Sequence, residues 1–371
     1  MAEDGRIKLF MCGDVMCGRG IDQVLPHPSE PTLHESYVKD ARLYVRLAEE
    51  ASGTIPRPVG FDYVWGDALA ELNRARPDVR LINLECAVTT SGEWWPDKEV
   101  HYRMHPRNVP VLGAAGIQCC SLANNHVLDW GHAGLNQTLE TLKAAGLRGA
   151  GAGRNLAEAA SPAAVEVAGK GRVLVFGLGS ESSGIPWEWG ATAGGPGVWL
   201  LEDLSAGTAE AVGEAMRRRR APGEVVVASI HWGPNWGWSV SGEQRRFAHR
   251  LIETGGADVI HGHSSHHVKG LEVYRRRLII YGCGDFIDDY EGIAGYEEFR
   301  PDLGLMFFVS LEAGGGLAAV ELVPTQIRRF QVRRAAADGA AWLHEVLNRE
   351  GERFTTTVEL GPERRLVLRW D

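Results

Sequence analysis

Four of the chain's 13 histidines lie within seven positions, in the stretch IHGHSSHHVKG at residues 260–270. Histidine is the commonest metal ligand in proteins and the usual proton carrier near neutral pH. If DVIHGH is a strand, its alternation places His261 and His263 on one face, and His266 follows on a loop that can turn back toward them. The cluster predicts either a metal site or a solvated histidine-rich loop, and partners elsewhere in the chain decide between the two.

Polar side chains end six of the seven predicted strands. Short apolar runs that end in polar or glycine-containing turns predict strands at 7–13, 79–85, 117–123, 172–179, 224–231, 258–263 and 277–283. Besides the histidine cluster, the residues at or just after the strand ends are Asp14, Glu85, Asn125, His126, Asp129, His231 and Asp285. Ligands of open α/β sheets collect beyond the carboxyl ends of the strands, so we expect these side chains to converge.

The combination of carboxylate, amide and imidazole groups favours a metal centre. Each residue alone has a structural explanation, such as a turn cap for Asp14 or a hydrogen-bonded core position for His231. Together they are costly to bury without a cation. Oxygen and imidazole donors suit one or two ions of Mn²⁺, Fe²⁺, Zn²⁺ or Co²⁺, with Ca²⁺ or Mg²⁺ less favoured. Glu85 is the candidate for a carboxylate that bridges two ions.

Helical and strand patterns alternate along the chain, which favours an α/β sandwich with mixed sheets. Helices are expected at 65–75, 133–145, 203–219 and 243–254. The stretch 303–327 predicts a hairpin that turns at Gly314–Gly316, and a final helix near 336–349 precedes a C-terminal strand. We expect one domain over residues 1–371 with its core at about 7–330, the C-terminal helix and strand packing on it, and irregular loops at 23–62 and 180–200.

Composition excludes several classes of protein. The formal net charge of −9 makes nucleic acid or an anionic membrane surface an unfavourable principal partner. The chain has no run of 18 apolar residues for a membrane anchor, and the stretch MAEDGRIKLFMCGD lacks the apolar core of a signal peptide. Six cysteines without a disulfide spacing pattern fit a reduced, cytoplasmic protein. The oligomeric state is left open.

Six stretches in order, CGDVMCGR, NLECAVT, SLANNHVLDWG, IHWG, GHSSHHVKGLEVY and LIIYGCGDF, resemble the motifs of the CapA-type family. That family is named for poly-γ-glutamate capsule synthesis and belongs to the calcineurin-like metallophosphoesterase superfamily. The resemblance runs from about residue 7 to 290 and implies a four-layer α/β/β/α sandwich with a dinuclear metal centre.

The same resemblance implies a ligand set. Asp14 and Glu85 would be ligands, with Glu85 bridging, and His266 would hold the first metal. Asn125, His231 and His263 would hold the second metal. His126 would be the acid or base beside the metals.

Three functions are compatible with such a centre. The favoured hypothesis is a metal-dependent peptide epimerase, because the chain resembles the lasso-peptide epimerase among CapA-like proteins. It would invert an α-carbon of a ribosomally made precursor peptide, for example at its C-terminal residue. The alternatives are a metal-dependent hydrolase of phosphoester or amide bonds, related to capsule poly-γ-glutamate, and a non-catalytic assembly partner.

The epimerase hypothesis assigns further roles. His126, His231, Asp129 and Cys86 are the candidates for the groups that remove and return the proton. Arg19 and Arg103 would pair with a substrate carboxylate or, equally, with acidic residues of the protein. Seven of the 12 tryptophans, Trp232 among them, lie in expected loops that either hold a peptide or simply pack.

Overall fold

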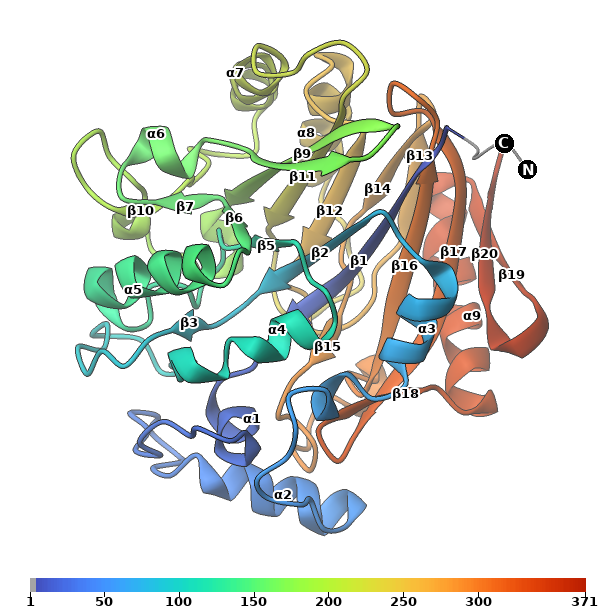
Figure 1. The fold of residues 1–371 in the computed structure, drawn as a ribbon. Helices are drawn as coiled ribbons and strands as arrows, with labels where there is room; N and C mark the ends of the chain where they lie inside the picture. The colour runs from blue at the N-terminus through green and yellow to red at the C-terminus, as the bar shows by residue number, and fades with distance from the viewer. Residues whose placement is uncertain (1–4) are drawn as a thin grey trace.

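Two β-sheets lie face to face in the computed structural model, which describes residues 5–371 (Figure 1). The larger sheet has ten strands and is mixed, because β1, β2, β5 and β6 run parallel while β16 and β17 are antiparallel to their neighbours. β15 (Asp285–Ile287) pairs with β1, and β18 (Gln331–Arg334) pairs with β17. The other eight strands of the larger sheet lie side by side in the order β19 (Thr356–Leu360), β20 (Leu366–Trp370), β17 (Leu317–Arg328), β16 (Leu303–Leu311), β1 (Ile7–Val15), β2 (Val79–Leu84), β5 (Cys119–Ser121) and β6 (Arg148–Ala150).

The smaller sheet has six strands and is also mixed. Its central strands are parallel, and the edge strands β13 and β8 are antiparallel to their neighbours. The order is β13 (Leu271–Tyr274), β14 (Arg277–Ile280), β12 (Val259–His263), β11 (Val225–His231), β9 (Gly171–Gly179) and β8 (Ala163–Val167). Two short pairs lie outside the large sheets: β3 (Ala87–Val88) with β4 (Arg103–Met104), and β7 (Ala152–Gly153) with β10 (Gly197–Val198).

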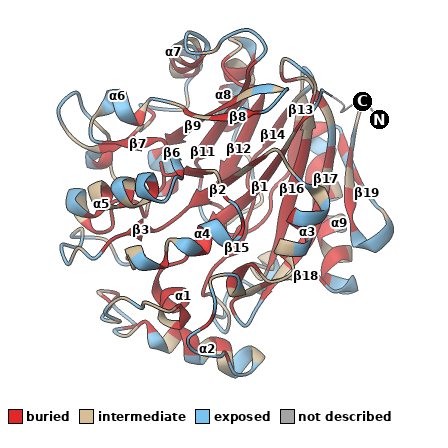
Figure 2. Cartoon of the chain, viewed as in Figure 1, coloured by how far each residue is buried: buried red, intermediate tan, exposed pale blue. Residues whose placement is uncertain are grey.

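Helices cover the outer face of each sheet, which makes four layers and confirms the predicted α/β/β/α sandwich with mixed sheets (Figure 2). The larger sheet is covered by α3 (Ala68–Ala75), α4 (Pro110–Ala114) and α5 (Gly131–Ala144). The smaller sheet is covered by α7 (Ala206–Arg217) and α8 (Gly242–Glu253). The other helices are α1 (Arg19–Val24), α2 (Arg42–Ser52), α6 (Leu156–Ala159) and α9 (Ala337–Gly351), of which α9 packs on β19.

The strands alternate between two apolar layers. On β1, Ile7, Leu9 and Met11 join the cluster between the two sheets, whereas Phe10 and Cys12 join the cluster under the helices. Each such side chain stabilises the fold by about 1.5–3 kcal/mol when fully buried. The period of two therefore determines which face of the larger sheet meets the smaller one.

Two segments differ from the expectation. The region 23–62 contains α2, whose buried face is Tyr44, Val45 and Ala48, so it is not irregular throughout. Its short apolar stripe is interrupted by arginines and glutamates, which weakens the helical pattern in the sequence. The expected single C-terminal strand is a hairpin of β19 and β20.

Candidate metal centre

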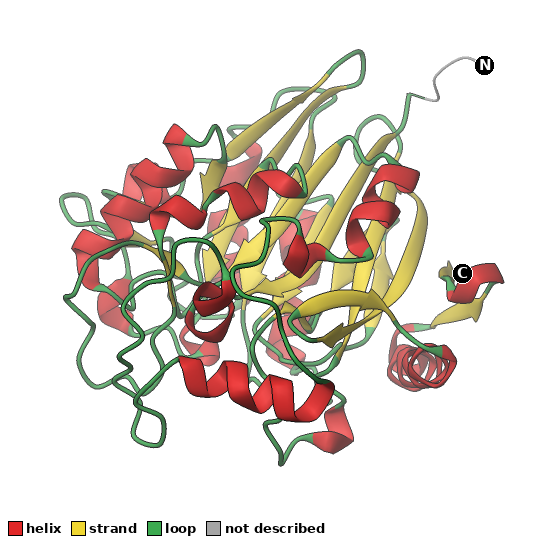
Figure 3. Cartoon of the chain, turned by 60° about the horizontal axis from the view of Figure 1, so that its bottom comes forward, coloured by secondary structure: helices red, strands yellow, loops and turns green. Residues whose placement is uncertain are grey.

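The layer between the sheets changes from apolar to polar along the strands. On β11, Val227 faces the larger sheet, and the same face continues with Ser229 and His231. On β2, the face that carries Leu81 continues with Asn83. All five side chains are buried. The polar groups therefore meet at the carboxyl ends of the strands, an end that Figure 3 turns forward and shows with long loops around it.

Asp14 and Asp285 lie side by side on the parallel strands β1 and β15. Gly13 permits this pairing, because a Cβ at that position would lie 1.6 Å from the carbonyl oxygen of Gly284. Both carboxylates are buried, and the Oδ2 atom of each has no hydrogen-bond partner among the described residues. Burial and the charge of Asp285 raise the pKa of Asp14 to about 7. Such a pair is favourable only when a proton or a cation compensates the charge.

Three histidines approach the carboxylates from the smaller sheet. His231 ends β11 and His263 ends β12 in register with it, and their Nδ1 atoms lie 2.8 Å apart. Ser264 follows with a φ of +101°, and this turn brings His266 back until its Nδ1 lies 2.9 Å from Asp285 Oδ1. Burial lowers the pKa of His231 and of His263, so both are neutral, which is the form that binds metal ions.

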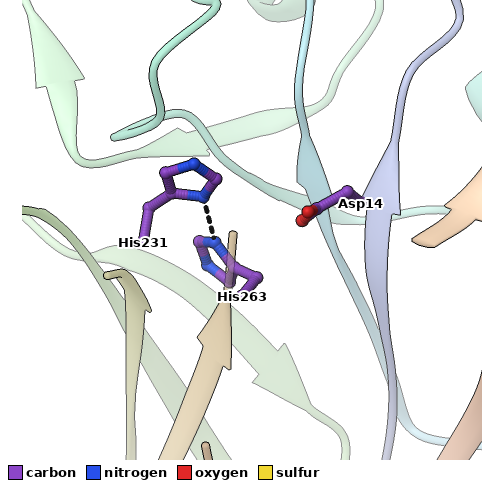
Figure 4. A group of neighbouring side chains, drawn as sticks. All are labelled: Asp14, His231 and His263. Atoms are coloured by element: carbon purple, nitrogen blue, oxygen red, sulfur yellow. Dashed lines mark hydrogen bonds between the residues drawn. The ribbon is translucent and has the colours of Figure 1, made fainter. Parts of the chain in front are cut away.

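Asp14 belongs to two overlapping groups of donor atoms. It lies with His231 and His263 in one group (Figure 4) and with His266 and Asp285 in the other, and the atoms of each group lie within 4.8 Å of one another. Carboxylate oxygens, two of them without partners, and imidazole nitrogens form a donor set that fits a divalent transition-metal ion. That one or two ions bind here stays a prediction.

Glu85 and Asn125 border these groups. Glu85 Oε1 lies 3.7 Å and Asn125 Oδ1 lies 3.0 Å from His231 Nε2. The side chain of Asn83 donates hydrogen bonds to Asp14 and to Glu85, at 2.8 Å and 2.9 Å, and so fixes the two carboxylates relative to each other. The bridging position was assigned to Glu85 from the resemblance, whereas the structure places Asp14 in both groups.

His126 lies beside the two groups with an acidic partner of its own. Its Nδ1 lies 2.7 Å from Asp129 Oδ2, and its Nε2 lies 4.0 Å from Glu85 Oε1. We assign the proton to Nδ1, because the carboxylate, which can only accept, lies closer to this nitrogen than the Lys98 ammonium, which can only donate and lies 2.9 Å away. Burial lowers the pKa of His126 to about 4, and the nearby Lys98 ammonium adds to this against the effect of Asp129. His126 is therefore neutral near pH 7, with an Nε2 lone pair directed at the centre.

Lys98 and Asp285 were not among the predicted site residues. Lys98 Nζ contacts Asp129 Oδ1 and the carbonyl of Asn125, and lies 2.9 Å from His126 Nδ1. A lone lysine in an acidic loop carries no sequence signal for such a place. Asp285 did have a sequence signal, because it follows a strand end in GCGDF. Nothing in the sequence, however, shows that β15 pairs with β1.

The two arginines proposed for a substrate carboxylate already have partners in the protein. Arg19 forms buried ion pairs with Asp289 and Glu35. Arg103 donates to the carbonyl oxygens of Ser91 and Glu30, and its guanidinium lies 3.9 Å from the ring centroid of Trp130. Of the two partners predicted for Arg19, the structure therefore shows the acidic residues of the protein.

Trp232 and Cys86 are core residues. The Trp232 side chain is 1% exposed, donates its indole N–H to the carbonyl of Tyr281 and packs under α8, so it does not line a surface that a substrate can reach. Cys86 is fully buried, and burial raises its pKa well above the ordinary thiol value. A thiol of this kind is a poor base, which corrects its assignment to proton transfer.

Comparison with known sequences decides the family. The family described as bacterial capsule synthesis protein PGA_cap matches residues 8–290. The chain belongs to this family. It is 44% identical over 364 residues to the probable polyglutamine synthesis accessory protein of Mycobacterium tuberculosis, covering 98% of this chain and 96% of the relative.

Two further relatives are more distant. The capsule biosynthesis protein CapA of Bacillus anthracis is 25% identical, over 88% of this chain and 69% of its own length. The PGA biosynthesis protein CapA of Bacillus subtilis is 24% identical, over 77% of this chain and 64% of its own length. The predicted CapA-type membership is confirmed.

The epimerase hypothesis is wrong on these findings. The relatives are named for capsule, PGA or polyglutamine synthesis, and the name of the 44% identical relative describes an accessory protein. Both alternatives, the capsule-related hydrolase and the assembly partner, agree better with these names. Within the described residues, every helix is too short or too polar to cross a lipid bilayer.

Proposed function

We propose that the protein is a metal-dependent accessory protein of poly-amino-acid synthesis that hydrolyses a bond in the polymer or in one of its precursors. One observation carries the proposal: Asp14 is shared by two buried donor groups, and the His126–Asp129 pair lies next to them but outside both. A buried donor set with a separate proton acceptor is the arrangement that metal-assisted hydrolysis requires. The names of the relatives supply the polymer.

Asp14, Asp285, His231, His263 and His266 would hold the metal, which would supply positive charge to polarise a substrate carbonyl or phosphoryl oxygen. His126 accepts a proton at Nε2 from the attacking water, whose oxygen forms the new bond to carbon or phosphorus, and gives that proton to the leaving nitrogen or oxygen as the old bond breaks. Asp129 keeps the Nδ1 proton in place during this exchange.

The test compares three substrate classes with protein loaded separately with Mn²⁺ and Zn²⁺. Oligomers of γ-linked glutamate, oligomers of α-linked glutamine and p-nitrophenyl phosphate are incubated with it, and chromatography with mass spectrometry records new amine ends or released phosphate. Amide cleavage that depends on metal and is absent in His126→Ala supports the proposal. Phosphate release alone would restrict it to phosphoesters.

A second candidate is an assembly partner without catalysis, which the word accessory in the relative's name favours. In that case the metal would stabilise the fold through the same five residues. Metal bound to the protein, without cleavage of any of the three substrates, would replace the hydrolase by this function.

A further inference from the structure

Three loops surround the centre, and each contacts one of its side chains or backbone groups. Loop 91–100 contributes Lys98, which reaches His126 and Asp129. Loop 180–190 contributes Ser183, whose hydroxyl donates to the carbonyl of His231 at 3.1 Å. Loop 288–300 contributes Tyr290, whose ring lies edge-on to that of His266 at 5.3 Å. We call these three loops the rim.

The rim has a large excess of acidic over basic residues. It contains ten carboxylates and two basic residues, a net charge of −8, while the whole chain has −9. Seven of the carboxylates are exposed, and within the described residues none of the seven forms an ion pair: Glu93, Asp97, Glu99, Glu181, Glu188, Glu297 and Glu298.

The basic side chains of the rim are already neutralised. Lys98 is paired with Asp129, and Arg300 is paired with Asp302. Beside the third loop, a cavity of about 400 Å³ is lined by Arg300 and Arg328, but also by four carboxylates: Asp288, Glu291, Glu297 and Asp302. An anionic chain that approached the centre would therefore meet an excess of like charge on all three loops.

Each rim loop also exposes one large aromatic side chain. Trp94 is 42% exposed, Trp187 is 54% exposed, and Tyr296 is 41% exposed and stacks on Trp236 at 3.9 Å. Exposed aromatic faces on separate loops provide contact area for an extended chain without requiring charge on it. At the base of the rim, Asp14 and Asp285 each keep one buried carboxylate oxygen that has no partner among residues 5–371, so the enclosed site is one that a ligand completes.

We propose that the rim selects a polyamide with uncharged side chains, of the glutamine type, and repels the glutamate polyanion. The inference rests on the proposed function, because it assigns the polymer to the same centre. It chooses between the two polymers that appear in the names of the relatives, polyglutamine and PGA. The discriminating residues are the exposed carboxylates of the rim.

The experiment measures binding, so it does not depend on turnover. Hexapeptides of glutamine and of glutamate, each in α- and γ-linked form, are titrated into metal-loaded protein at about 20 mM and at about 500 mM NaCl, where the screening length falls severalfold. We expect the glutamine peptides to bind at least about tenfold more tightly at low salt, and the ratio to fall toward one at high salt.

A variant with E93Q, E99Q, E188Q and E298Q tests the residues directly. This rim variant should lose most of its preference for glutamine peptides over glutamate peptides, because the glutamate peptides gain affinity. A control variant with E166Q, E345Q, E352Q and E359Q, at glutamates that are exposed outside the rim, should keep the preference. Equal or tighter binding of the glutamate peptides by the wild type, an unchanged ratio in the rim variant, or no binding of either peptide would overturn the inference. Binding with the expected ratio but without cleavage would instead count against the hydrolase and leave the inference standing.

Discussion

The two ends of the layer between the sheets have the same architecture and opposite chemistry. At the amino ends of the strands the facing side chains are Leu9, Val79 and Val227. At the carboxyl ends the same faces present His231 and Asp14, which reaches this face because the register of β1 shifts between Met11 and Asp14. Both ends are almost fully buried. Burial alone therefore does not identify the functional end, whereas the residue types at the strand termini do.

The comparison also separates stability from function. The apolar end gains free energy from every buried side chain. The polar end instead places two carboxylates side by side, each with an oxygen that lacks a hydrogen-bond partner in the part of the chain that the structure describes. The fold tolerates the polar end because the apolar layers are extensive. Mutations at the two ends should consequently change different measured quantities.

Asp14→Ala should have the largest effect, because it removes the side chain that both donor groups share. We expect metal affinity to fall by more than the about 10–100-fold that a change outside the ligand set causes. Isothermal titration with Zn²⁺ or Mn²⁺ measures the loss. Asp285→Ala, which belongs to one group, should remove part of the binding, and equal losses in the two variants would contradict the shared position of Asp14.

His126→Ala should separate proton transfer from metal binding. His126 lies outside both donor groups, so metal affinity should stay near that of the wild type. Hydrolysis should fall by about 10²–10⁴-fold, which is the usual contribution of a positioned acid or base. Turnover that is unchanged while the metal is retained would remove His126 from the mechanism.

Most of the fold could be predicted because it depends on local sequence patterns. The strands that end in His231 and His263 are short apolar runs, buried along their whole length, and they end in the predicted places. The position of β15 beside β1 could not be predicted, because it depends on a contact between Gly13 and Gly284 that are far apart in the sequence. For that reason Asp285 was recognised as a strand-end residue without being assigned as a ligand.

The site residues divide in the same way. Those at strand ends converge as expected, since parallel strands bring their carboxyl ends to one edge. Trp232 was misplaced because only the tertiary structure shows that Tyr281 is its partner. For Arg19 the sequence left a substrate carboxylate and an acidic residue of the protein open, and the tertiary structure supplies Asp289. The function was misassigned for another reason: the motifs contain the strand-end residues, whereas the selectivity proposed above lies in loops that the motifs do not include.

Leu9→Ala tests the apolar end of the same strand. Leu9 is 1% exposed between the sheets, so we expect a loss of about 2–5 kcal/mol in the free energy of unfolding from the missing side chain and the cavity it leaves. Metal affinity per folded molecule should not change. Urea denaturation with metal titration of the folded variant measures both quantities, and a fall in affinity at low denaturant would show that the two ends are coupled.

Asp14→Asn should produce the smallest effect, seen in the metal-free protein as a function of pH. The pKa of Asp14 is raised from 3.8 to about 7 by burial and by Asp285, so between these values the folded wild type binds this proton more tightly than the unfolded chain does. The stability due to this proton is present below pH 3.8 and is lost as the pH rises through 7. Asparagine has no such loss, so the melting temperature of the variant relative to the wild type should increase from pH 4.5 to 7.5, by roughly a few degrees. Scanning calorimetry with a chelator measures the difference in melting temperature, in which the contributions of histidines common to both proteins largely cancel.

With saturating Zn²⁺ at pH 7.5 the wild type should instead have the higher melting temperature, because a cation then compensates the charge of the Asp14 carboxylate. A difference in melting temperature that changes neither with pH nor with metal would place Asp14 outside the centre.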